Sequence, residues 1–128
     1  MLDLGNVMDI AHIRLNGKDM GFLWRPPFRK DISHALLPGE NRLEIQIYNR
    51  WVNRLIGDEQ LPDDAKWAGQ NRHVPLAEWP AWFLEGKDSP TGRIAFTTFK
   101  HWLKDDPLLE SGLIGPVILR FANEKPLP

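Results

Sequence analysis

Apolar and polar residues alternate most plainly in the run 10–15, near the start of the chain. In an extended chain, the apolar residues Ala11, Ile13 and Leu15 of this run fall on one face. A period of two predicts an extended strand with one buried and one exposed face. Asn16 and Gly17 follow directly. Because both residue types tolerate a positive φ, this pair predicts a tight hairpin turn.

The next stretches continue the sheet. Residues 20–24 supply the returning strand of the hairpin. Pro26 and Pro27 then turn the chain in a new direction, because proline has no backbone N–H to donate to a strand ladder. A further strand is expected over 28–32. The run 42–49 alternates again, with its leucine and isoleucines on one face, and predicts another half-buried strand.

Between residues 57 and 92 the alternation does not persist. This segment contains four prolines and three tryptophans. An irregular segment of this length is typical of a functional loop or of an insertion. Short helical turns are expected on both sides of Pro80.

Residues rich in β-branched and aromatic side chains return at 93–99 and 117–121, which predicts two final strands. The Ser-Gly pair at 111–112 is typical of a turn between them. Short strands joined by turns, with few helix candidates, predict an all-β fold. We expect one β-sandwich domain over residues 1–128, with an irregular insertion at 57–92.

Composition and charge exclude several classes of protein. The net charge is −1, and the 16 basic and 17 acidic side chains are dispersed, so the basic stripe typical of a nucleic-acid partner is missing. The absence of cysteine excludes disulfides, zinc-thiolate sites and cysteine nucleophiles. No apolar run approaches the roughly 20 residues that span a bilayer, and we expect no membrane partner.

Tryptophans are the strongest candidates for ligand binding. The chain has 6 of them, and a pyranose stacks its C–H face on such rings while polar groups bind its hydroxyls. A small sandwich can equally use its rings as core. Trp67 and Trp82 lie in the irregular segment, and Trp24 lies at the hairpin exit. With Arg25 and Asn53 as partners for hydroxyl groups, they form the predicted carbohydrate-binding site.

Four carboxylates cluster in the irregular segment, namely Asp58, Glu59, Asp63 and Asp64. A glycosidase needs two carboxylates across the scissile bond, and Ca²⁺ takes several oxygens from one flexible loop. The spacing does not match an EF-hand loop, and most such clusters are solvated surface. We expect no catalytic residue and no cofactor, with Ca²⁺ at this cluster as the alternative.

Histidine and serine offer no catalytic pattern. The 4 histidines are scattered and form no H-E-x-x-H motif. The serines Ser33, Ser89 and Ser111 do not lie in a Gly-x-Ser-x-Gly turn. A hydrolase with a serine triad is therefore not expected.

Several blocks of the sequence resemble known families. Leu-Asp-Leu-Gly at 2–5, His-Ile-Arg-Leu-Asn-Gly-Lys at 12–18, Leu-Trp-Arg-Pro-Pro-Phe at 23–28 and Pro-Gly-Glu-Asn-Arg-Leu at 38–43 resemble the galactose-binding-like jelly-roll domains of family 2 glycoside hydrolases. The later blocks 51–62, 97–102 and 111–117 resemble more narrowly the C-terminal region of family 106 α-L-rhamnosidases. Such domains usually begin with one or two strands before the first block, and these are missing here.

The resemblance implies a jelly-roll β-sandwich that lacks its first strands and is a piece of a larger protein. It also implies that the parent is an α-L-rhamnosidase acting on plant polysaccharide, periplasmic or secreted in a bacterium. Residues 1–128 would then be a non-catalytic accessory domain. Its expected partners are a rhamnose- or galactose-containing glycan and the catalytic domain of the parent.

Two other functions stay open at this point. An unpaired sheet edge can template another chain, so the sandwich could be a protein-interaction or bracing module without sugar affinity, including a dimer paired through edge strands. The chain could also be a small glycosidase that uses Asp58 or Glu59 with Asp63 or Asp64.

Overall fold

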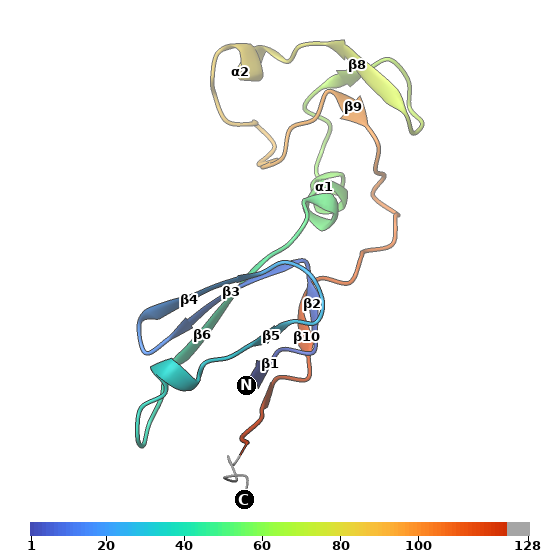
Figure 1. Cartoon of the computed structure of the whole chain (residues 1–128). Coiled ribbons are helices and arrows are strands. Elements are labelled where there is room, and N and C mark those ends of the chain that lie inside the picture. Colours follow the sequence, from blue (N-terminus) through green and yellow to red (C-terminus); the bar gives the residue numbers. More distant parts are fainter. Residues whose placement is uncertain (123–128) are drawn as a thin grey trace, which may run out of the picture. The chain divides into compact units, whose positions relative to one another are not determined.

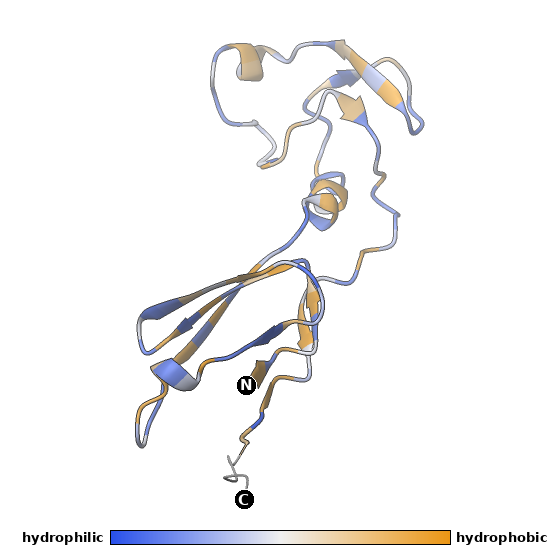
Figure 2. Ribbon diagram, in the orientation of Figure 1, coloured by the Kyte–Doolittle hydropathy of each residue, from blue (hydrophilic) through white to orange (hydrophobic). Residues whose placement is uncertain are grey.

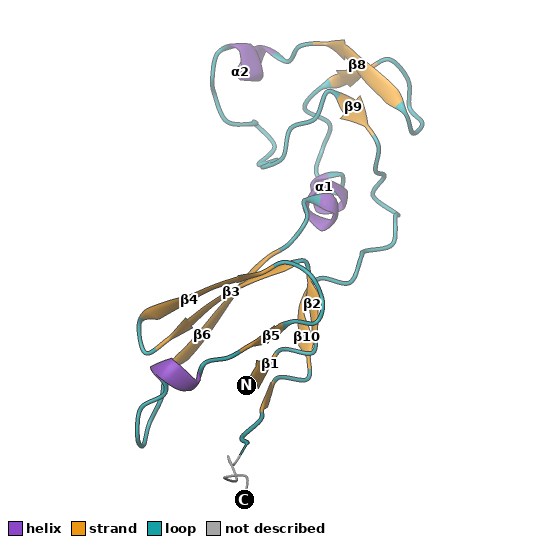
Figure 3. Cartoon of the chain, viewed as in Figure 1, coloured by secondary structure: helices purple, strands orange, loops and turns teal. Residues whose placement is uncertain are grey.

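The computed structural model describes residues 1–122, which form two compact units (Figure 1). Unit 1 comprises Met1–Arg50 and the residues from Glu110 onward, and unit 2 comprises Trp51–Leu109. The segment 57–92, expected as an insertion, lies within unit 2. Figure 3 shows that strands predominate in unit 1, whereas loops connect short elements in unit 2.

Unit 1 is built around a three-stranded antiparallel sheet with the order β4 (Lys18–Leu23), β3 (Ile10–Leu15), β6 (Leu43–Tyr48). The predicted hairpin between β3 and β4 is confirmed. Its turn residues adopt positive φ, 54° at Asn16 and 78° at Gly17.

The side chain of Asn16 has a second role besides the turn. Its Nδ2 donates to the carbonyl oxygen of Ala35 at 2.9 Å and to Asn41 Oδ1 at 2.8 Å. Its Oδ1 accepts a hydrogen bond from the backbone N–H of Arg42 at 2.9 Å. The hairpin turn therefore fixes the loop that leads the chain into β6.

Shorter strands form the opposing layer of unit 1. β1 (Leu2–Asp3) lies between β5 (Arg29–Lys30) and β11 (Ile118–Leu119), and all three are antiparallel. β2 (Asn6–Met8) pairs with β10 (Gly112–Gly115). A 3₁₀ turn, η1 (Ser33–Ala35), follows β5. The first and last described parts of the chain are thus joined in one sheet layer.

The core of unit 1 lies between these layers. Ala11, Ile13 and Leu15 of β3 are 0%, 0% and 1% exposed, as their alternation predicts. The other buried members of the cluster come from strands of both layers and from the segments that connect them: Leu2, Leu4, Val7, Met20, Phe28, Ile32 and Ala35. Each buried leucine or isoleucine contributes about 1.5–3 kcal/mol. Figure 2 shows the alternation along the strands, and the all-β sandwich is confirmed.

Unit 2 contains α1 (Val52–Asp58), α2 (Ala81–Leu84) and a small antiparallel sheet. The order of that sheet is β7 (Lys66–Trp67), β8 (Val74–Glu78), β9 (Phe99–Lys100). The helical turn expected after Pro80 is present as α2. The turn expected before it is strand β8 instead, because residues 74–78 find backbone partners on both sides.

Two further predictions are wrong. The strand expected over 93–99 is irregular up to Thr98, because the backbone N–H groups of Ile94 and Ala95 donate to the carboxylate of Asp58 at 3.1 and 2.7 Å. The turn expected at 111–112 is the start of β10, where Gly112 pairs with Met8. Both outcomes depend on partners far away in the sequence.

Among residues 1–122, no helix is long and apolar enough to cross a membrane.

Candidate functional site

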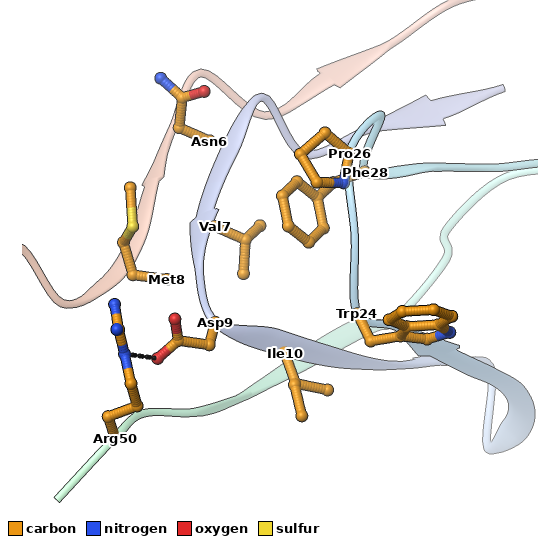
Figure 4. A pocket seen from close by; sticks show the side chains of 9 residues that line it. All are labelled: Asn6, Val7, Met8, Asp9, Ile10, Trp24, Pro26, Phe28 and Arg50. Carbon is orange, nitrogen blue, oxygen red and sulfur yellow. Dashed lines mark hydrogen bonds and ion pairs between the residues drawn. The ribbon is translucent and has the colours of Figure 1, made fainter.

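Unit 1 carries an open pocket of about 580 Å³ beside the exits of β2 and β4 (Figure 4). The residues around it come from three separate segments of unit 1: Asn6, Val7, Met8, Asp9, Ile10, Trp24, Pro26, Phe28 and Arg50. We call this the Trp24 pocket.

The floor and the rim of the Trp24 pocket differ in character. Val7 and Phe28 are 4% and 6% exposed and belong to the core, so they form a rigid apolar floor. Asp9 and Arg50 lie at the rim, where Arg50 Nε donates to Asp9 Oδ2 at 3.0 Å (Figure 4). Both side chains are partly exposed. The pocket thus combines an apolar base with a hydrogen-bonding edge.

Trp24 is 66% exposed, although it is the largest apolar side chain of the pocket. It follows β4 directly, and Pro26 and Pro27 then take the chain away from the sheet edge. The guanidinium carbon of Arg25 lies 5.1 Å from the centroid of the indole ring, a cation–π contact. Arg25 therefore supports one face of the ring, while much of the indole remains accessible to a ligand.

Two of the predicted site residues have internal roles in unit 2. Asn53 Nδ2 donates to the carbonyl oxygen of Leu109 at 2.8 Å, and its Oδ1 accepts from the N–H of the same residue at 2.9 Å. Trp82 Nε1 donates to the carbonyl oxygen of Asp64 at 2.8 Å, and its ring meets Phe96 edge-on at 5.5 Å. The polar groups of both side chains are already engaged.

Trp67 is partly exposed and lies in a hollow of unit 2. Lys100 Nζ lies 5.8 Å from the centroid of its ring. Asp63, Lys66 and Gln70 line the same hollow. Of the five predicted residues, the structure therefore brings Trp24 and Arg25 together in unit 1 and leaves Trp67 in a separate polar hollow.

The carboxylate cluster is largely occupied by cations of unit 2. Glu59 accepts from Arg93 Nη1 at 3.0 Å and lies 3.0 Å from Lys100 Nζ. Asp64 Oδ1 lies 3.1 Å from Arg93 Nε, which is not aimed at that oxygen, so this contact is an ion pair without a hydrogen bond. Asp64 also accepts from the Ser89 hydroxyl at 2.6 Å.

Asp58 is 2% exposed and holds the backbone of residues 94 and 95. In residues 1–122 no three histidine, aspartate or glutamate side chains converge as a metal site would require. The cluster is arranged as a set of structural ion pairs.

Sequence reasoning missed the Asp9–Arg50 pair of the Trp24 pocket. The two residues are 41 positions apart, and neither belongs to a recognisable motif. Only the pairing of β3 with β6 brings them together, because Ile10 lies opposite Tyr48 in that register.

Comparison with known proteins links the chain to long glycoside hydrolases. It is 46% identical over 126 residues to a protein of Formosa agariphila named "Putative beta-glucuronidase", covering 98% of this chain and 10% of that protein. It also matches the structure of a rhamnosidase from Novosphingobium sp. PP1Y, with a TM-score of 0.63 and 37% identity over 91% of this chain. No family model matches.

The matches concern only a segment of each relative. The chain spans about a tenth of the length of these proteins, 10% of one and 8% of the other. It is therefore related to one part of large glycoside hydrolase chains.

Proposed function

We propose that this chain is a non-catalytic accessory part of a glycoside hydrolase and that unit 1 binds carbohydrate in the Trp24 pocket. The observation that carries the proposal is the indole of Trp24, 66% exposed at the edge of an open pocket with an ion pair at its rim. An accessible ring supplies the stacking surface for a pyranose, and Asp9 and Arg50 supply acceptors and donors for its hydroxyls.

The carboxylates support a non-catalytic role. A glycosidase needs one carboxylic acid to protonate the leaving oxygen and a second carboxylate across the bond. Asp58, Glu59 and Asp64 instead neutralise cations or hold backbone groups. A general acid could not leave such contacts without leaving a buried charge unpaired. Hydrolysis is accordingly a function of other parts of the parent chain.

The ligands to test first are rhamnose, galactose and oligosaccharides that contain them. Calorimetric titration of the whole chain should give saturable binding to at least one of these sugars. Trp24→Ala should weaken that binding at least roughly two- to tenfold, because stacking on an aromatic ring contributes about 0.5–1.5 kcal/mol beyond the buried area. Trp51→Ala is a matched control, since Trp51 is 62% exposed and lies outside the pocket.

Trp67 forms a second candidate contact within the same proposal, in the hollow that it shares with Lys66, Gln70 and Lys100. Trp67→Ala in the same titration shows whether the sugar binds in this hollow or in the Trp24 pocket. If only Trp67→Ala weakens sugar binding, the carbohydrate site belongs to unit 2 and the Trp24 pocket is not the site.

A bracing role is favoured by one observation in unit 2. Trp79, Phe83, Leu84 and Ile94 are 52%, 42%, 69% and 66% exposed, an apolar surface of the kind that contacts other proteins. The partner would be the remainder of the parent chain. This role would be supported instead if the folded chain binds no saccharide and Phe83→Glu abolishes its self-association or its binding of a hydrophobic dye.

A further inference from the structure

A second group of rings lies on the outer face of the β4-β3-β6 sheet. His12 and Phe22 stack with centroids 4.2 Å apart and an interplanar angle of 12°. Tyr48 lies beside Phe22, with 6.1 Å between centroids. Phe22 and Tyr48 are 55% and 45% exposed. We call these three residues the sheet-face rings.

Strand register brings the sheet-face rings together. His12 lies opposite Phe22 of β4, and Ile10, two residues earlier, lies opposite Tyr48 of β6. Successive side chains of a strand point to opposite faces. Since Ala11 and Ile13 are buried in the core, His12 and its cross-strand neighbours face away from it.

Neighbouring polar groups hold the rings in place. His12 Nε2 lies 3.0 Å from Asp19 Oδ1, and the same oxygen accepts from the N–H of Gly21 at 2.7 Å. These contacts with Gly21 and His12, in that order, keep the pKa of Asp19 below its ordinary value. Tyr48 Oη donates to Gln46 Oε1 at 3.0 Å. The ring surface is thus formed before any ligand arrives.

The sheet-face rings continue the Trp24 pocket. Trp24 follows Phe22 by two positions and directly succeeds the last residue of β4. Ile10, the cross-strand partner of Tyr48, also lines the pocket. Trp24, Ile10, Phe22 and Tyr48, which are 37–66% exposed, therefore form one track of accessible apolar and aromatic surface, with the buried ring of His12 beneath Phe22.

The size and surroundings of this track favour a sugar chain over a protein. A stable protein interface buries on the order of 1,000 Å² or more and involves about 20–30 residues a side. The track offers a few rings, and polar side chains of the same face surround it, including Arg14, Asp19 and Gln46. Rings flanked by hydrogen-bonding groups match the alternation of C–H faces and hydroxyls along an oligosaccharide.

We infer that the carbohydrate ligand is an oligosaccharide of at least two or three sugar units, with one unit in the Trp24 pocket and the next stacked on Phe22 and Tyr48. This inference rests on the proposed function, because it needs a sugar in the pocket. It adds that affinity increases with the length of the chain and that the sheet-face rings are responsible for the increase.

Calorimetric titration of the whole chain with a length series tests this. The probes are galactose and β-1,4-linked galacto-oligosaccharides of two to four units, together with rhamnose and rhamnose-containing oligosaccharides. Affinity should rise roughly two- to tenfold for each further ring that stacks. Phe22→Ala and Tyr48→Ala should remove most of this rise, so that the longer chains bind about as tightly as the monosaccharide.

Matched variants separate ring stacking from other effects. Phe22→Leu retains apolar surface without a ring and should lose the dependence on length as Phe22→Ala does. Leu37→Ala is the control, since Leu37 is 56% exposed, belongs to unit 1 and lies outside the sheet. It should behave as the wild type. Circular dichroism of each variant shows whether the sandwich is intact before titration.

The outcomes distinguish the two proposals. If no saccharide of any length binds to folded wild type, the proposed function fails and this inference fails with it. If a monosaccharide binds in a Trp24-dependent way and longer chains bind no more tightly, only this inference is overturned. It is also overturned if Phe22→Ala abolishes a concentration-dependent dimer, because the rings would then contact a second copy of the chain.

Discussion

The two units of this chain are stabilised by different interactions. Unit 1 has a continuous core to which strands from both layers contribute. In unit 2 the buried apolar residues of the described chain are Ile56, Pro80 and Ala95, and charged side chains take a large part of the interior. Arg93, with a side chain 6% exposed, is paired with Glu59 and Asp64.

This difference follows from the sequences of the two units. Alternation of period two gives unit 1 an apolar sheet face that can be covered. Unit 2 has no such period, and its loops are positioned by carboxylates that bind cations and backbone N–H groups. Buried ion pairs contribute less net stability than apolar contacts, yet removing one partner is strongly destabilising. Unit 2 should therefore be the more sensitive to loss of a single charge.

The largest effect is expected for Arg93→Ala. This change leaves Glu59 and Asp64 half-paired in places where their side chains are 10% and 3% exposed, and should cost about 3–5 kcal/mol. Hydrogen exchange of the amides of residues 94 and 95 measures the loss within unit 2. Arg93→Lys should retain part of the protection. Unchanged exchange in Arg93→Ala would show that the ion pairs do not stabilise unit 2.

A core substitution in unit 1 should have a comparable but somewhat smaller effect. Ile13 is 0% exposed at the centre of β3, and Ile13→Ala should lower the free energy of unfolding by about 2–4 kcal/mol through lost burial and a cavity. Ile13→Val should cost about 1 kcal/mol. Urea denaturation monitored by circular dichroism measures both. Equal values for the two variants would contradict the tight packing of this layer.

Acid should weaken both units, and one carboxylate in each unit serves as the test. The pKa of Asp3 in unit 1 is lowered from its ordinary value of 3.8, first by the N–H of Gly5 and then by Arg29. The pKa of Asp106 in unit 2 is lowered by Arg72 and then by the N–H of Leu103.

A lowered folded-state pKa means that the stabilisation is fully present above the unfolded value and is lost as the pH falls through the folded value. Unfolding by urea should therefore require less denaturant as the pH falls from about 5 to below 3. Asp3→Asn should flatten this dependence in unit 1, and Asp106→Asn in unit 2. If neither substitution changes the slope of the urea midpoint against pH, the acid sensitivity belongs to other groups.

The smallest effect on stability is expected for Trp24→Ala. Because Trp24 is 66% exposed, its removal should change the free energy of unfolding by no more than about 0.5 kcal/mol. The same urea experiment measures this. A larger loss would mean that the indole stabilises the sandwich. Trp24→Phe, which retains a ring, would then be needed to separate the loss of stability from the loss of sugar binding.

Local features were predictable from the sequence alone. The β3–β4 hairpin and strand β6 follow from alternation and from the Asn16-Gly17 turn, because both depend on neighbours a few residues away. Trp24 was named as a ligand-binding candidate from its place at the hairpin exit, which is also a local feature, since the prolines after it prevent the strand from continuing.

Only the tertiary structure decided which segments meet. Strand β10 exists because Gly112 pairs with Met8, and residues 94 and 95 are not a strand because Asp58 takes their N–H groups. The Asp9–Arg50 rim and the sheet-face rings depend on the register of β3 with its two neighbours. Such partners are set by the packing of the whole unit, and no local pattern of residue types encodes them.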